Sequence, residues 1–156
     1  MGNGLKLKAQ DQEDLTIISA YLQDAVMVVG DFSYSPTTRI FALMLNRYKW
    51  EDHKVSTDGE NNKCCHRIRT GFHFENIVNV SAQNIPQNDK KHVLELLAIE
   101  LEELEGGNIA IDLIFAGDGV IRLKAELIEA SMQDVGEPYK AKCHPKHEIL
   151  DSLNEE

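Results

Sequence analysis

The sequence predicts an α+β fold in which mainly antiparallel hairpins form a sheet or a partly closed barrel, with one N-terminal helix packed on it. Three observations support this. Apolar residues alternate on either side of an AGDG segment in residues 108–129, a helical apolar stripe covers residues 12–22, and residues 39–48 are apolar on both faces. We expect six to nine strands, at or above the roughly four to six common in sheets. The 156 residues are 42% hydrophobic and 27% charged, which predicts one globular domain over residues 1–156.

The N-terminal segment predicts a strand followed by a helix. Leucines and an alanine alternate with lysines over residues 5–9, which is typical of a short edge strand. Asp11 is a good N-cap, and acidic residues in the next turn suit the positive end of a helix dipole. Leu15, Ile18 and Leu22 recur at helical spacing, so we predict a helix from Gln12 to Leu22.

The next segments predict short strands and one central strand. Residues 25–29 are rich in β-branched side chains, and a Ser-Pro-Thr-Thr turn separates residues 32–34 from residues 40–45, which predicts a hairpin. Because both faces of residues 39–48 are apolar, we expect that strand to be covered on both sides. Residues 51–66 have one aliphatic side chain and predict an exposed loop. Strand patterns return at residues 67–74 and 77–82.

Residues 93–104 fit either a helix or a strand. They carry good helix formers and a helical apolar stripe, but Glu105, Gly106 and Gly107 follow as a turn directly before a clear strand. We therefore predict a strand that pairs with residues 108–115. Residues 128–135 predict either a continued strand or one helical turn, and residues 140–156 an irregular tail.

The loop with Gly117, Asp118 and Gly119 is explained by the register of the hairpin around it. Keeping the apolar set on one face requires an odd number of loop residues, either three or five. A phosphate loop needs a following helix, and a calcium loop needs further spaced oxygen ligands; neither is present. We expect a turn with a bulge at Gly119.

The net charge of −10 lies entirely in the second part of the chain. Residues 1–91 carry equal numbers of basic and acidic side chains, whereas residues 92–156 carry 5 basic and 15 acidic ones. Such a chain has no footprint for the nucleic-acid backbone, so we expect no nucleic-acid partner. The acidic part either keeps the protein soluble or docks a protein partner.

Three cysteines, two of them adjacent, favour a reducing cytoplasmic location over a disulfide framework. No segment approaches the roughly 18 consecutive apolar residues of a membrane span, and the N-terminus lacks a secretory pattern, so we expect no membrane partner. A zinc site is the weaker hypothesis for Cys64, His66, Cys143 and His147, because zinc ligands usually come in closely spaced pairs. No cofactor and no catalytic residue is predicted.

A cationic and aromatic rim is the candidate ligand site. Arg47 and Trp50 end one predicted strand, and Arg69 and His73 lie in the next. If the strands are neighbours, these side chains would gather and suit a carboxylate, phosphate or peptide. The competing interpretation is that they form salt bridges to the many acidic residues.

Four blocks carry a resemblance to a known family: residues 22–34, 39–51, 94–102 and 115–139. Together they resemble the domain-of-unknown-function family 2948, found largely in alphaproteobacteria, over residues 5–148. The resemblance implies a small stand-alone protein and brings no known activity, cofactor or site residue.

Three functions follow from the sequence. The first is a non-catalytic cytoplasmic binding or protein-interaction module, because the chain has no catalytic constellation and a strongly asymmetric charge. The second is a small-ligand binder or enzyme that uses the rim of Arg47, Trp50, Arg69 and His73. The third is a homodimer joined through an exposed strand edge, and the sequence leaves the oligomeric state open.

Overall fold

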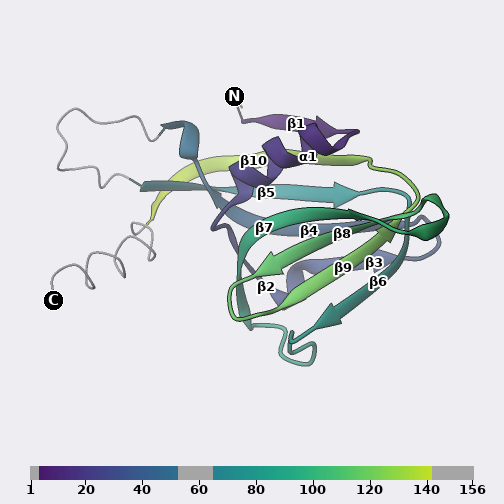
Figure 1. Cartoon of the computed structure of the whole chain (residues 1–156). Helices are drawn as coiled ribbons and strands as arrows, with labels where there is room; N and C mark the ends of the chain where they lie inside the picture. Colours follow the sequence, from purple (N-terminus) through teal and green to yellow (C-terminus); the bar gives the residue numbers. More distant parts are fainter. Residues whose placement is uncertain (1–3, 53–64, 142–156) are drawn as a thin grey trace, which may run out of the picture.

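The computed structural model describes residues 4–52 and 65–141, and it confirms one N-terminal helix and a mostly antiparallel sheet (Figure 1). The elements are β1 (Lys6–Ala9), α1 (Gln12–Leu22), β2 (Val26–Val28), η1 (Val29–Asp31), β3 (Phe32–Ser35), β4 (Ile40–Tyr48), η2 (Trp50–Asp52), β5 (Cys65–Phe74), β6 (Ile77–Gln83), β7 (Val93–Glu103), η3 (Glu105–Gly107), β8 (Ile109–Phe115), β9 (Val120–Ala125) and β10 (Ala130–Ala141).

The strands form one open antiparallel sheet in the order β1-β10-β5-β4-β2-β7-β8-β9-β6, with β3 paired to β4 off this path. The described residues thus hold ten strands, one more than the expected maximum, because the segment after β9 is a full strand rather than a helical turn. The sheet is not closed into a barrel: β1 and β6 are its two ends.

The helix α1 packs its predicted stripe into the core. Leu15, Ile18 and Leu22 are buried, and the side chain of Asp11 accepts a hydrogen bond from the backbone N–H of Asp14 at 2.8 Å, as the N-cap pattern predicts. The helix also contacts β7, where the hydroxyl of Ser19 accepts a hydrogen bond from the backbone N–H of Ile99 at 3.0 Å. Tertiary contact therefore fixes α1 beside β7.

The two contested hairpins are resolved by their registers. Residues 93–103 are a strand, and β7 pairs with β8 from Leu96↔Phe115 to Glu103↔Ile109. In the next hairpin the N–H of Phe115 donates to the carbonyl of Gly119 at 2.9 Å, which leaves the three-residue loop that burial requires.

The bulge expected at Gly119 is absent, because the register runs unbroken to Ile114↔Val120. Positive φ angles fall instead at Gly117 (85°) and Asp118 (70°). A side chain at Gly119 would be crowded, since a Cβ there would lie 3.1 Å from Cγ1 of Ile85. The turn therefore sets the register between β8 and β9, as the alternation of apolar residues predicts.

β4 is covered less completely than expected. Phe41, Leu43 and Leu45 are buried on the inner face, whereas on the outer face Tyr48 is buried but the four alternate residues before it, from Ile40 to Asn46, are only half-buried. The helix covers the inner side, and no second layer covers the outer side within residues 4–52 and 65–141.

Two predicted irregular segments are shorter than expected. Trp50–Asp52 form a 3₁₀ turn and β5 begins at Cys65, so only residues 53–64 of the predicted loop lie outside the described residues. β10 runs to Ala141, past Gly136 and Pro138, because a register shift between Val135 and Tyr139 absorbs those two residues. Residues 142–156 of the predicted tail lie outside the described part.

Candidate functional site

Arg47 lies on the inner face of β4, in the same alternating set as Phe41, Leu43 and Leu45. Its side chain is 0% exposed, and that of Asp134 on β10 is 1% exposed. Nε of Arg47 donates to Oδ1 of Asp134 at 2.9 Å and Nη2 donates to Oδ2 at 2.7 Å. This bidentate pair reaches across β5 and links β4 to β10.

The remaining donors of Arg47 are also occupied. Nη1 donates to the carbonyl of Tyr48 and to Oε1 of Glu51, each at 3.0 Å, and Nη2 donates to Oε2 of Glu51 at 2.7 Å. A guanidinium has five N–H groups, so all five are satisfied within the protein. Arg47 has no donor left for a ligand.

Asp134 is equally well satisfied. Oδ1 also accepts a hydrogen bond from the hydroxyl of Thr70 at 2.7 Å, and Oδ2 accepts one from the backbone N–H of Leu5 at 2.9 Å. Burial alone would raise the pKa of Asp134, but the hydrogen bonds from Arg47, Thr70 and Leu5 outweigh it and lower that pKa below its usual range. The carboxylate therefore stays charged and holds the N-terminal segment against β10.

The predicted rim of Arg47, Trp50, Arg69 and His73 is not formed as one cluster. Arg47 pairs with Ile68 in the register, so it faces inward while Arg69 and His73, of the opposite parity, face outward. Strand parity therefore separates Arg47 from Arg69 and His73, so these residues do not meet at one rim.

The other three rim residues have partners of their own. A nitrogen of Arg69 lies 3.3 Å from a carboxylate oxygen of Asp31, and Nε2 of His73 lies 3.3 Å from Oε2 of Glu75. The indole N–H of Trp50 donates to the carbonyl of Gln23 at 3.2 Å.

Arg67, at the start of β5 next to the predicted rim, is a buried cation. Its guanidinium carbon lies 3.8 Å from the ring centre of Tyr48, its cross-strand partner, and Nη1 donates to the carbonyl of Asn46 at 2.8 Å. Desolvated stacking on an aromatic ring makes this contact structural.

The structure describes only one of the four residues of the zinc hypothesis. His66 lies in β5, whereas Cys64, Cys143 and His147 lie outside the described residues. Among the residues that are described, no group of three or more His, Cys, Asp or Glu side chains is arranged to hold a metal ion.

The acidic part of the chain is concentrated on β7 and the turn after it. Four glutamates are exposed: Glu100, Glu102, Glu103 and Glu105. Arg122 on β9 is the cation nearest to them in the register, and it is bound to Asp112 at 2.8 Å and to Glu102 at 2.6 Å. No ion pair within the described ranges engages Glu100 or Glu103, so this surface has an excess of negative charge.

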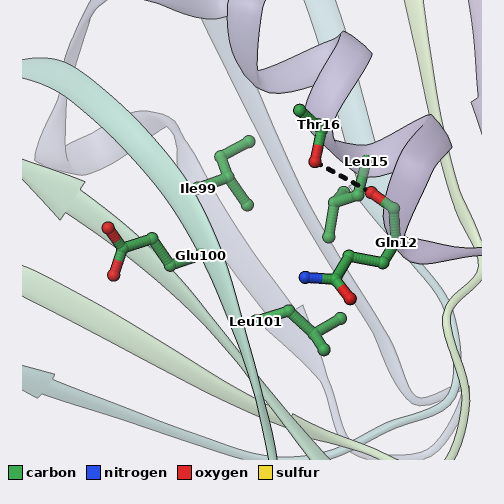
Figure 2. Close-up of a pocket in the computed structure, with 6 residues that line it drawn as sticks. All are labelled: Gln12, Leu15, Thr16, Ile99, Glu100 and Leu101. Carbon is green, nitrogen blue, oxygen red and sulfur yellow. Dashed lines mark hydrogen bonds between the residues drawn. The ribbon is translucent and has the colours of Figure 1, made fainter.

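A groove of about 300 Å³ runs beside this acidic strand, between β7 and the first half of α1 (Figure 2). The helix contributes Gln12, Leu15 and Thr16, and the strand contributes Ile99, Glu100 and Leu101. Figure 2 shows Ile99 and Leu101 on the helix side of β7, with Glu100 pointing away from the helix.

The side chains of Thr16 and Gln12, on the helix side of the groove, form no hydrogen bond across it to β7. The hydroxyl of Thr16 donates to the carbonyl of Gln12 at 3.0 Å, within the helix itself, and the exposed carboxamide of Gln12 extends over Leu101. The groove is thus lined by three aliphatic side chains and by the polar Gln12 and Thr16, with Glu100 at its rim. Sequence reasoning missed it because it depends on where α1 packs against β7.

The fold and this groove define an α+β protein with an open antiparallel sheet, a structural arginine centre and an acidic strand edge. The chain belongs to the family of proteins of unknown function DUF2948, whose model matches residues 5–147. No curated protein and no solved structure matches the chain. No helix in the described part of the chain is long and apolar enough to cross a membrane.

Proposed function

We propose that this protein is a non-catalytic interaction module that binds a basic segment of a partner protein at the outer edge of β7. The observation that carries the proposal is the excess of exposed carboxylates on β7, next to a groove lined by both aliphatic and polar side chains. Complementary charge steers a partner to such a surface and rejects partners of the same sign.

The charge of the surface favours a polypeptide over a nucleic acid. Phosphate backbones are bound through lysine and arginine, and Arg122 near this edge is already engaged by Asp112 and Glu102. The three cysteines, two of them adjacent, support a cytoplasmic setting for the interaction.

A charge-matched peptide pair tests the proposal. The probes are a fluorescent heptapeptide of alternating lysine and valine and its glutamate–valine counterpart, with binding followed by fluorescence anisotropy. We expect the protein to bind the lysine peptide only. The affinity should fall as salt rises from about 0.01 M to 1 M, because the Debye length shrinks from about 30 Å to about 3 Å. Equal binding of both peptides, or no binding of the lysine peptide, contradicts the proposal.

A matched pair of double variants locates the binding surface. Glu100→Gln/Glu102→Gln removes two carboxylates from β7, and we expect about a three- to tenfold weaker affinity for the lysine peptide, since each exposed ion pair contributes about 0.2–1 kcal/mol. Asp118→Asn/Glu137→Gln removes the same charge from exposed positions off β7 and should leave the affinity unchanged. Equal effects of the two variants would place the binding site elsewhere.

A further inference from the structure

The main-chain groups of β7 change neighbours along the strand. In its first half β7 pairs with β2, from Val26↔Glu95 to Val28↔Val93. The pairing ends where the N–H of Leu96 donates to the carbonyl of Ala25 at 2.9 Å. Beyond that point no strand lies on this side of β7 in the described residues.

The helix α1 supplies a hydrogen-bond acceptor to the next outward-facing position of β7. The N–H of Ile99 donates to the hydroxyl of Ser19 at 3.0 Å, so the main-chain groups of Ile99 face away from β8. At the far end, the N–H of Leu104 donates to the carbonyl of Asn108 at 2.8 Å, on the β8 side. Because successive residues of a strand alternate in direction, Leu101 and Glu103 also face away from β8.

Leu101 and Glu103 therefore present an open strand edge. Each has one N–H and one carbonyl on the side where β7 has no strand neighbour, and within residues 4–52 and 65–141 no hydrogen bond reaches these N–H groups. Such an edge is a template for one more strand. The exposed carboxamide of Gln12 extends over Leu101 in Figure 2 and makes no hydrogen bond within the described residues.

The two faces of an added strand would meet different surroundings. Side chains on the helix side would enter the groove of about 300 Å³, where the aliphatic Leu15, Ile99 and Leu101 lie beside the polar Gln12 and Thr16. Side chains on the other side would lie next to Glu100 and Glu102, in closely spaced cross-strand pairs that suit lysine or arginine.

A second copy of this chain does not fit the same edge. Two copies of β7 joined edge to edge would place Glu100, Glu102, Glu103 and Glu105 of one beside those of the other, and like charges directly opposite each other are destabilising. The charge thus selects a basic partner over a homodimer.

We propose that the basic segment binds by strand addition: it lies along β7 at Leu101 and Glu103, with alternate aliphatic side chains in the groove beside α1 and alternate basic side chains beside Glu100 and Glu102. This inference rests on the proposed function and specifies its mode. Recognition of an extended peptide by a sheet edge next to a helix gives affinity through main-chain hydrogen bonds and specificity through alternate side chains.

Backbone N-methylation of the lysine–valine heptapeptide tests this mode. In a heptapeptide that begins with lysine, one probe is N-methylated at the three valines and the other at the three lysines after the first residue, so the two differ only in which strand edge is blocked. Strand addition uses one edge of the peptide, so we expect one probe to lose at least about tenfold in affinity while the other binds as the parent peptide does. Equal affinities for the two probes overturn strand addition but leave the charge-based proposal standing. If the unmethylated peptide does not bind, both the charge-based proposal and strand addition are wrong.

A proline at Glu103 tests the same contact from the side of the protein. Glu103→Pro removes the outward N–H at an exposed edge position, where proline is tolerated in a strand. Glu103→Gln is the matched control, because it removes the same charge and keeps the N–H. We expect the proline variant to bind about two- to tenfold more weakly than the glutamine variant, the worth of one hydrogen bond. Equal affinities for two variants with unchanged circular dichroism contradict the proposal.

Discussion

Arg47 and Asp134 form a bidentate ion pair on the inner face of the sheet, with both side chains almost fully buried. The pair joins β4 to β10, and Thr70 and the N–H of Leu5 complete the shell of the carboxylate. Arg47 therefore stabilises the fold. From the sequence alone, an arginine near the end of a strand suggests a ligand site instead.

Removal of one partner of this pair should destabilise the protein strongly. Arg47→Met leaves Asp134 buried without its counter-charge, and we expect a loss of about 3–5 kcal/mol in the free energy of unfolding, measured by urea denaturation. The double variant Arg47→Met/Asp134→Leu should be clearly more stable than Arg47→Met. As a control, Arg69→Met breaks a half-exposed pair with Asp31 and should change stability by less than about 1 kcal/mol. A loss that small for Arg47→Met would refute the structural role.

The free energy of unfolding should fall in acid because Asp134 and Glu51, the two carboxylates bound to Arg47, become protonated. Burial alone would raise the pKa of Glu51, but its hydrogen bonds with Arg47 lower it, and the pKa of Asp134 is lowered in the same sense. The unfolded chain then binds more protons than the folded one below about pH 5, near the ordinary pKa values of about 4. The stabilisation is complete above this range and is lost as the pH falls through the lowered folded-state pKa values. Urea midpoints between pH 7 and pH 3 measure it, and Glu51→Gln should show a smaller decline.

The loop between β8 and β9 should tolerate asparagine better than alanine. Gly117 has φ of 85° with open space around it, so Gly117→Ala strains the backbone and should cost about 1 kcal/mol in unfolding free energy. Asparagine adopts the left-handed region more readily, so Gly117→Asn should cost less. If both variants lose equal stability, backbone conformation is not the reason for this glycine.

The groove beside α1 should be closed by a bulky side chain. Thr16 is exposed on the helix and lines the groove, so Thr16→Trp fills the space without disturbing the core. We expect at least about a fivefold weaker affinity for the lysine–valine peptide, as expected when a well-packed contact is lost. Tryptophan at Ile17, an exposed helix position outside the groove, is the control and should leave the affinity unchanged. The same anisotropy assay measures both variants.

The acidic edge should also keep the protein monomeric. Two β7 edges repel each other through their glutamates, so light scattering at two concentrations should give the mass of one chain. A stable dimer that Glu103→Pro dissociates would assign this edge to self-association, contrary to our account.

Local patterns predicted much of the fold. The helix over residues 12–22 follows from its cap and stripe, and alternation predicts an odd loop length before Gly119, of which the structure has three residues rather than five. The choice of strand for residues 93–103 came from the turn after it, because the apolar spacing also suits a helix. The position of β10 between β1 and β5 depends on pairing between distant segments, which no local pattern encodes.

The candidate sites show the same limit. Arg47, Thr70 and Asp134 each share the parity of buried apolar neighbours, a signal in the sequence that predicts burial for all three. That signal assigns them to the core, although it does not pair them. The open edge at Leu101 could not be predicted, since it exists only because α1, rather than a strand, lies beside the second half of β7.

The central claim is that β7 receives a basic strand at Leu101 and Glu103. Nuclear magnetic resonance of the ¹⁵N-labelled protein with the lysine–valine heptapeptide tests it most directly. We expect the amide resonances of Leu101 and Glu103 to shift downfield and their hydrogen exchange to slow, while the exchange of the exposed Asp118 amide is unchanged. Saturation with peptide that leaves the exchange of both amides unaltered would contradict the account.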